Sequence, residues 1–218
     1  MKRSLPFVIV AAVAIIALSA GALLYRAKRP AALAISEKDA LGKTGESIHM
    51  RGREDAPVTV EEFADFQCPP CGTMAGPLQQ VERDYGSRLR VIFRQHPLAV
   101  HAHAREAALA AEAAGLQGRF WEMHDLLFRE QALWSGAPDA HALFLSYAGT
   151  IGLNVEQFKK DMADTKTQAH IAADEERATN LKVVSTPTLF INNEALPPTS
   201  LNLASLRAGI DAALQKKR

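Results

Sequence analysis

The two cysteines of the chain, Cys68 and Cys71, are separated only by two prolines. A lone C-x-x-C pair is a redox pair or half of a metal site, because neither thiol is left for a structural disulfide elsewhere. Residues 57–66 are rich in β-branched and aromatic side chains and predict a buried strand. Since proline suits the first turn of a helix but cannot continue a strand ladder, we expect Cys68 to begin a helix that ends near Tyr85.

The rest of the chain predicts further strands and helices of an α/β fold, with a block of several helices inserted between two strands. Residues 88–95 alternate polar and apolar side chains, which is the period of a second strand. Residues 102–178 are rich in alanine with apolar positions three and four apart, which indicates several helices. Residues 188–192 predict a strand followed by an Asn-Asn turn, and residues 203–215 predict a closing helix.

Three motifs in this order resemble the DsbA-like branch of the thioredoxin superfamily. They are EFADFQCPPC at residues 62–71, GRFWEMHDLLF at residues 118–128 and STPTLF at residues 185–190. The resemblance runs from about Arg51 to the C-terminus. It implies a thioredoxin fold spanning residues 48–218 with a helical insertion at about 102–178, and an enzyme that exchanges disulfides without a metal or an organic cofactor.

Disulfide exchange needs one thiolate that attacks and a second thiol that expels the partner from the mixed disulfide. At a helix N-terminus, Cys68 is expected to have a lowered pKa, and Cys71 is expected to be the buried resolving thiol. DsbA carries histidine where this chain has Pro70, whereas thioredoxins, which are reductants, carry proline. The direction of electron flow therefore stays open between an oxidase and a reductase or isomerase.

The resemblance also assigns a proton-transfer role to Glu62, six residues before Cys68. A buried carboxylate without a salt partner has a raised pKa, which suits proton transfer near neutral pH. The alternative is that Glu62 points to solvent while Glu61 points inward.

Thr186 and Pro187 resemble the loop that packs against the C-x-x-C pair in this family, with Pro187 in the cis form. The alternative is an ordinary trans proline that starts a strand. In the relatives, the residue before this proline pairs with extended substrate, so Thr186 is a candidate substrate contact together with Pro69 and Pro70.

The N-terminal segment predicts a membrane anchor. Residues 5–25 carry no charge and as a helix would span about 31 Å, enough to cross a bilayer. We expect residues 1–29 to be a single-pass anchor in the cytoplasmic membrane and residues 30–47 a tether. The catalytic domain would then lie on the extracytoplasmic, periplasmic side. The alternative is a signal peptide cleaved near Ala20-Gly21-Ala22, which would leave a soluble periplasmic protein.

Charge limits the choice of partners. Five of the 25 basic residues precede residue 30, and no acidic residue does, which leaves 20 basic against 24 acidic residues in the remainder. This balance argues against nucleic acid, which needs clustered positive charge. We expect exported substrate proteins and a membrane redox partner that recharges the cysteine pair.

Other interpretations of the same residues have less support. The cysteines could join His96 and His101 in a zinc site, but the gap between the two halves is longer than in zinc fingers. His101 and His103 would lie on a helix and face solvent. A cysteine protease leaves Cys71 unexplained. A peptide-binding chaperone that uses the helical insertion as a groove stays open as a rival of another class.

Overall fold

The structure is a computed structural model, and it describes residues 49–216. The expected anchor (residues 1–29) and tether (residues 30–47) lie outside the described residues. Among residues 49–216, no helix is both long enough and apolar enough to cross a membrane.

Within the described residues, five strands form one mixed sheet in the order β1-β3-β2-β4-β5. Only β2 and β3 are parallel; the other neighbouring pairs are antiparallel. The sequence predicted β2, β3 and β4 but neither of the edge strands. The strands are β1 (His49–Gly52), β2 (Val58–Ala64), β3 (Leu89–Gln95), β4 (Thr188–Ile191) and β5 (Glu194–Ala195).

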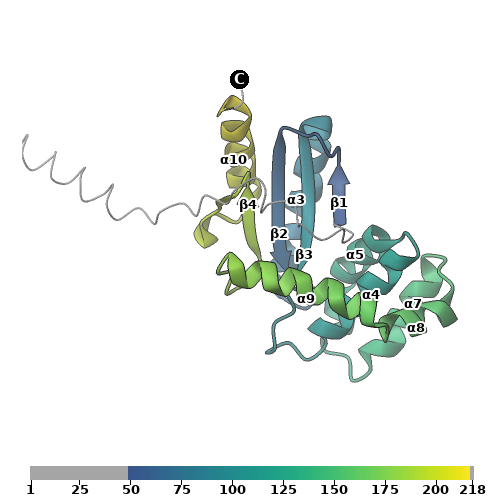
Figure 1. Ribbon diagram of the computed structural model, residues 1–218. Coiled ribbons are helices and arrows are strands. Elements are labelled where there is room, and N and C mark those ends of the chain that lie inside the picture. Colours follow the sequence, from purple (N-terminus) through teal and green to yellow (C-terminus); the bar gives the residue numbers. More distant parts are fainter. Residues whose placement is uncertain (1–48, 217–218) are drawn as a thin grey trace, which may run out of the picture. The chain divides into compact units, whose positions relative to one another are not determined.

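Helices cover both faces of this sheet (Figure 1). On one face, α3 (Pro69–Tyr85) and α10 (Leu203–Lys216) pack on the valines of β2. On the other face, Ala178 of α9 (Thr165–Asn180) packs on Phe63 of β2. The strand, helix and second strand that the sequence predicted are β2, α3 and β3, and together they form a parallel β-α-β unit.

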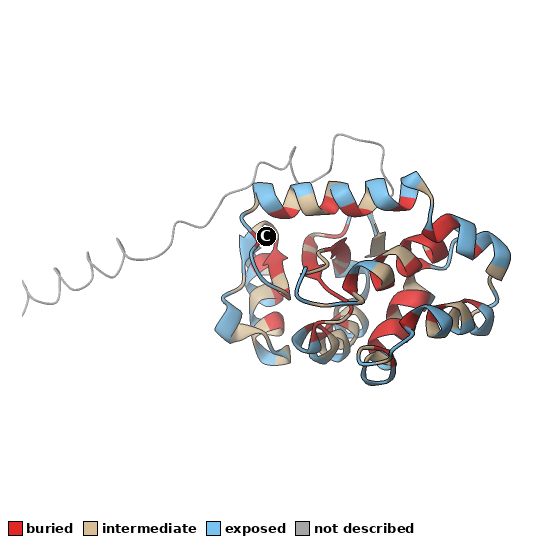
Figure 2. Ribbon diagram, turned by 90° about the horizontal axis from the view of Figure 1, so that it is seen from below, coloured by how far each residue is buried: buried red, intermediate tan, exposed pale blue. Residues whose placement is uncertain are grey.

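The helical insertion lies between β3 and β4 and confirms the thioredoxin-like α/β fold with an inserted helical block. It comprises α4 (Ala104–Leu116), α5 (Phe120–Arg129), α6 (Gln131–Trp134), α7 (Ala140–Thr150), α8 (Val155–Met162) and α9. Its core forms around α4, whose alanines let the neighbouring helices approach closely. Figure 2 shows buried residues on the inner sides of these helices and exposed residues on the outer sides.

Short connections complete the chain. A 3₁₀ turn at Gly86–Arg88 joins α3 to β3, and a second at Pro198–Ser200 precedes α10. Asn192 and Asn193 both have positive φ, as a two-residue hairpin turn between β4 and β5 requires. The predicted Asn-Asn turn is therefore confirmed.

The placement predicted for two histidines was wrong. His101 and His103 lie in the turn before α4, not on a helix, since α4 begins at Ala104. The Nδ1 atom of His101 lies 2.7 Å from the Asp65 carboxylate, and the backbone N–H of His103 donates to the side chain of Gln67. Both residues are half-buried and bonded rather than solvated, because this turn packs against the segment just before the cysteines.

Candidate active site

The cysteines lie at the beginning of α3, just after the loop that follows β2. Cys68 is the N-cap of α3, with proline at the first helical positions, so the helix begins where the sequence predicted. Both cysteines carry free thiols, and Cys68 is 5% exposed whereas Cys71 is fully buried. The backbone N–H of Cys71 donates to the Cys68 carbonyl oxygen at 3.0 Å, which closes the first turn.

The loop before β4 closes over Cys68. The Thr186–Pro187 peptide bond is cis, as the resemblance implies. The thiol of Cys68 donates to the carbonyl oxygen of Thr186 at 3.4 Å, whereas the buried hydroxyl of Thr186 has no hydrogen-bond partner among the described residues. Two loops that are more than a hundred residues apart in the chain therefore meet at the Cys68 sulfur.

The surroundings give the two thiols very different pKa values. The pKa of Cys68 is lowered to about 6, chiefly by a hydrogen bond from the Cys71 side chain. Burial alone would raise this pKa, and the Thr186 side chain lowers it further. Burial strongly raises the pKa of Cys71. At neutral pH Cys68 is therefore mostly the thiolate, which is the nucleophilic form, and Cys71 holds its proton.

Replacing Thr186 by valine is expected to raise the pKa of Cys68 by roughly one unit, because the thiolate loses the buried hydroxyl that can turn to donate to it once the thiol proton has left. The ultraviolet absorbance of the thiolate, followed against pH in the reduced protein, measures this pKa. Thr73→Val is the matched control, since the hydroxyl of Thr73 is exposed and bonds to the Pro69 carbonyl oxygen. Equal titration curves for the three proteins would contradict the assignment.

Glu62 lies on the α3 face of β2 and is only 3% exposed, so the alternative in which it faces solvent does not hold. Its Oε1 atom has no hydrogen-bond partner in the described part of the chain. Burial, and secondarily the charge of Glu82, raise the pKa of Glu62 to about 8. The charge of Glu62 in turn raises the pKa of Cys71, so the carboxylate lies within electrostatic reach of the resolving thiol.

Sequence reasoning missed the polar groups that hold the cysteine loop. The carboxylate of Asp65 accepts hydrogen bonds from the backbone N–H groups of Gln67 and Leu98 and lies against His101. The side-chain amide of Gln131, on α6, donates to the carbonyl oxygens of Phe66 and Cys68. The insertion therefore fixes the loop that presents Cys68.

A shallow apolar pocket of about 420 Å³ lies beside the cysteine loop. Pro69 and Pro70 line it and are exposed, and Pro187 lies at the same pocket. The remaining lining residues are Thr73, Met74, Pro198 and Leu201. Two of the three candidate substrate contacts thus share a surface with the cis-proline loop.

The zinc site that the sequence allowed is not assembled. Among residues 49–216, neither cysteine belongs to a group of three potential metal ligands. The apolar side of α5 is part of the core: Phe120, Leu126, Leu127 and Phe128 are buried, and the half-buried Trp121 packs against the same cluster.

Comparisons with known proteins agree with this geometry. The sequence profile described as thioredoxin matches residues 43–212. Among solved structures, a thioredoxin-like oxidoreductase from Silicibacter pomeroyi is 27% identical, with a TM-score of 0.66 over 77% of this chain and 92% of that one. BdbD from Bacillus subtilis is 22% identical, with a TM-score of 0.68 over 76% of this chain and 92% of its own.

The curated relatives are named as antiporters rather than as thioredoxin-like proteins. A protein named Na⁺/H⁺ antiporter NhaA 1 from Salinispora arenicola is 39% identical over 171 residues, which is 78% of this chain and 25% of the relative. NhaA 1 from Mycolicibacterium gilvum is 39% identical over 154 residues, which is 68% of this chain and 24% of that protein. The chain thus spans about a quarter of the length of these relatives.

The fold, the paired thiols and the cis-proline loop define a protein thiol–disulfide oxidoreductase. The chain belongs to the thioredoxin family, whose model matches residues 43–212.

Proposed function

We propose that this enzyme forms disulfides in exported proteins. In its oxidised state, a substrate thiolate attacks the Cys68 sulfur, breaks the Cys68–Cys71 bond and releases the Cys71 sulfur. A second substrate thiolate then attacks the substrate sulfur of the mixed disulfide and releases Cys68. The substrate leaves with a disulfide, and its two electrons stay on the reduced cysteine pair until a membrane redox partner removes them.

The observation that carries this proposal is the lowered pKa of Cys68, about 6. A thiol of low pKa is a good leaving group in the last step, and stabilisation of the thiolate favours the reduced form of the enzyme over its disulfide. Both effects favour transfer of the disulfide to the substrate.

Glu62 supplies the proton that Cys71 needs. The sulfur of Cys71 is released into a fully buried position, where an unprotonated thiolate is unfavourable. With a pKa of about 8, Glu62 is mostly protonated at neutral pH and can donate to Cys71. The carboxylate then recovers its proton from solvent before the next cycle.

Substrate would bind in an extended conformation along the cis-proline loop. The backbone of Thr186 lies next to the Cys68 sulfur, and the apolar pocket beside Pro69 and Pro70 would receive a neighbouring substrate side chain. Main-chain pairing tolerates many sequences, which suits an enzyme that acts on many exported proteins.

We place the catalytic domain on the periplasmic side of the cytoplasmic membrane, anchored through the uncharged residues 5–25. The curated relatives support a membrane setting, because they are named as antiporters and the chain matches about a quarter of their length. A soluble periplasmic form after cleavage of the leader is the alternative. An intact N-terminal segment in the protein extracted from its native membrane would exclude cleavage.

A reductase or isomerase of the same fold is the second candidate, and Pro70 is the residue that favours it. The reduction potential of the Cys68–Cys71 pair, equilibrated against glutathione or dithiothreitol buffers in the full chain, separates an oxidase from a reductase. We expect a value between about −120 and −180 mV, the range of oxidases and isomerases. A value near about −270 mV, typical of thioredoxin, would overturn the assignment as an oxidase.

A further inference from the structure

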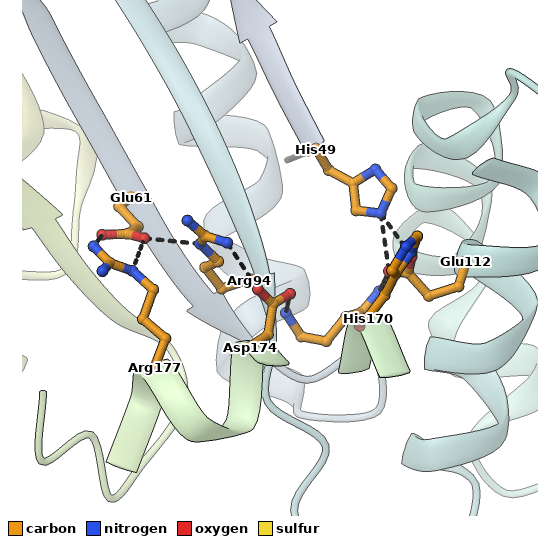
Figure 3. Close-up of polar contacts among 8 residues, drawn as sticks. His49, Glu61, Arg94, Glu112, His170, Asp174 and Arg177 are labelled. Carbon is orange, nitrogen blue, oxygen red and sulfur yellow. Dashed lines mark hydrogen bonds and ion pairs between the residues drawn. The ribbon is translucent and has the colours of Figure 1, made fainter. Parts of the chain in front are cut away.

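A cluster of two histidines and one glutamate lies apart from the cysteines, at the junction of the sheet and the insertion (Figure 3). His49 belongs to β1, Glu112 to α4 and His170 to α9. The Nε2 atom of His49 lies 2.9 and 2.8 Å from the two carboxylate oxygens of Glu112. The Nδ1 atom of His170 lies 3.1 Å from one of the same oxygens.

These three side chains bring together the donor atoms that zinc prefers. One nitrogen from each imidazole and one carboxylate oxygen all lie within 4.8 Å of one another. Two ligand atoms bound to the same tetrahedral zinc ion at about 2.0 Å lie about 3.3 Å apart. The imidazole-to-carboxylate distances of 2.8 and 3.1 Å are already close to this spacing, and the two imidazole nitrogens need to approach each other by about 1.5 Å at most. Calcium and magnesium prefer sets made of oxygen alone, so the two imidazoles select a transition metal.

The surrounding residues hold the ligands in place. The Glu112 side chain is only 1% exposed, and the amide of Gln95 donates to its Oε1 atom at 2.9 Å. The ring of His49 stacks face to face on Phe120. A Cβ atom at Gly115, three residues along α4 from Glu112, would lie 3.2 Å from the His49 ring, so glycine leaves the space that this ring occupies. Such outer contacts orient metal ligands.

The cluster is also accessible from one side. The side chain of His170 is 21% exposed, whereas those of His49 and Glu112 are 10% and 1% exposed. An ion and a water molecule for its fourth position can enter past His170. Because the ligands come from three elements, the ion would fasten the first strand of the domain to two helices of the insertion.

We propose that His49, Glu112 and His170 bind a divalent metal ion such as Zn²⁺. The ion replaces the imidazole-to-carboxylate hydrogen bonds with three metal–ligand bonds, and any proton on the coordinating nitrogens is released to solvent. The site is separate from the disulfide chemistry and takes no part in the electron transfer.

Zinc binding by the full chain tests the proposal. The protein is prepared without a histidine tag and is fully oxidised, so that the Cys68–Cys71 disulfide cannot bind the ion. Isothermal titration with Zn²⁺ is expected to give one ion per chain, and Ca²⁺ is expected to give no binding. His49→Gln and His170→Gln are each expected to weaken zinc binding about tenfold or more. His141→Gln, an exposed histidine of α7 that bonds to Glu106, is the matched control and is expected to bind zinc normally.

A second measurement uses the unaltered chain, in case a variant fails to fold. The histidine ring signals in the NMR spectrum report on all seven histidines, and Zn²⁺ is expected to shift those of His49 and His170 while leaving His141 in place. The absence of zinc binding by the oxidised wild type, or a shift confined to other histidines, would overturn the proposal.

Discussion

Replacing Glu62 by glutamine is expected to stabilise the folded protein relative to the wild type as the pH rises from 5 to 9. The folded pKa of Glu62 is about 8, against about 4.5 for an ordinary glutamate. Between these values the folded state holds a proton that the unfolded state has lost. The wild type therefore loses stability as pH rises through this window, and a glutamine, which does not titrate, removes that loss.

The expected size of this effect is large. A shift of about 3.5 pH units corresponds to roughly 4–5 kcal/mol of unfolding free energy at pH 9, relative to pH below about 4.5. At the acidic end the variant is expected to be less stable than the wild type by about 1–3 kcal/mol, because the amide would be buried where Glu62 Oε1 has no hydrogen-bond partner among the described residues. The two stability curves should therefore cross near the middle of the window.

Urea unfolding of the reduced proteins at a series of pH values measures the difference in unfolding free energy. Reduction matters because the raised pKa applies to the state with both thiols free. Glu176→Gln, at an exposed position on α9, serves as the control and should follow the wild type at every pH. Stability curves for Glu62→Gln that run parallel to the wild type would show that Glu62 is ionised in the folded protein at neutral pH.

The elements that the sequence predicted are those whose patterns are local. The strand before Cys68, the helix after it and the closing helix each contain their own apolar period and boundary residues. By contrast, β1 has four residues, of which only Met50 is a large apolar one, and β5 has only two residues. Each becomes a strand because it pairs with a neighbour, β1 with the distant β3 and β5 with β4 across a tight turn. Their pairing is a tertiary contact that carries no local signal.

The residues of the candidate site also fall into two groups, those that local motifs predict and those that only tertiary contacts reveal. Cys68, Cys71 and the cis Pro187 follow from motifs, and the structure brings Cys68 and the cis-proline loop into contact. Asp65 and Gln131 could not be inferred, because their hydrogen bonds join residues that no spacing connects.

Glu61 and Glu62 show where reasoning from a single strand failed. The sequence treated them as alternatives for one inward position. The structure buries both, because helices cover both faces of β2. Glu62 faces α3 without an ion-pair partner in the described chain, whereas Glu61 faces α9 and meets two arginines. The chemical difference between adjacent glutamates therefore arises from the helices above and below the sheet.

Glu61 belongs to a buried ionic network that, among the described residues, joins two carboxylates to two arginines (Figure 3). Its carboxylate accepts hydrogen bonds from Arg94 of β3 at 2.8 Å and from Arg177 of α9 at 2.6 and 2.7 Å. Arg94 also donates to Asp174 of α9 at 2.9 Å. Two acidic and two basic side chains thus join the sheet to α9, all of them 12% exposed or less.

Glu61→Gln is expected to destabilise the folded protein by about 3 kcal/mol or more, because it removes the buried carboxylate that two arginines contact. Urea unfolding at pH 7 measures the loss. Glu122→Gln removes the exposed ion pair with Arg119 on α5 and is the matched control, expected to change stability little. A loss for Glu61→Gln as small as that of the control would contradict the idea that this network holds α9 on the sheet.

The double variant Glu61→Gln with Arg94→Met tests whether the loss of stability comes from missing contacts or from an unbalanced buried charge. It removes one charge of each sign, so the net charge of the network is the same as in the wild type. It also removes the Arg94 guanidinium nitrogen that has no hydrogen-bond partner among residues 49–216. We therefore expect the double variant to lose less stability than the two single variants combined, by about 1–3 kcal/mol. Additive losses would mean that each arginine contact stabilises the protein independently and that charge balance has no part in it.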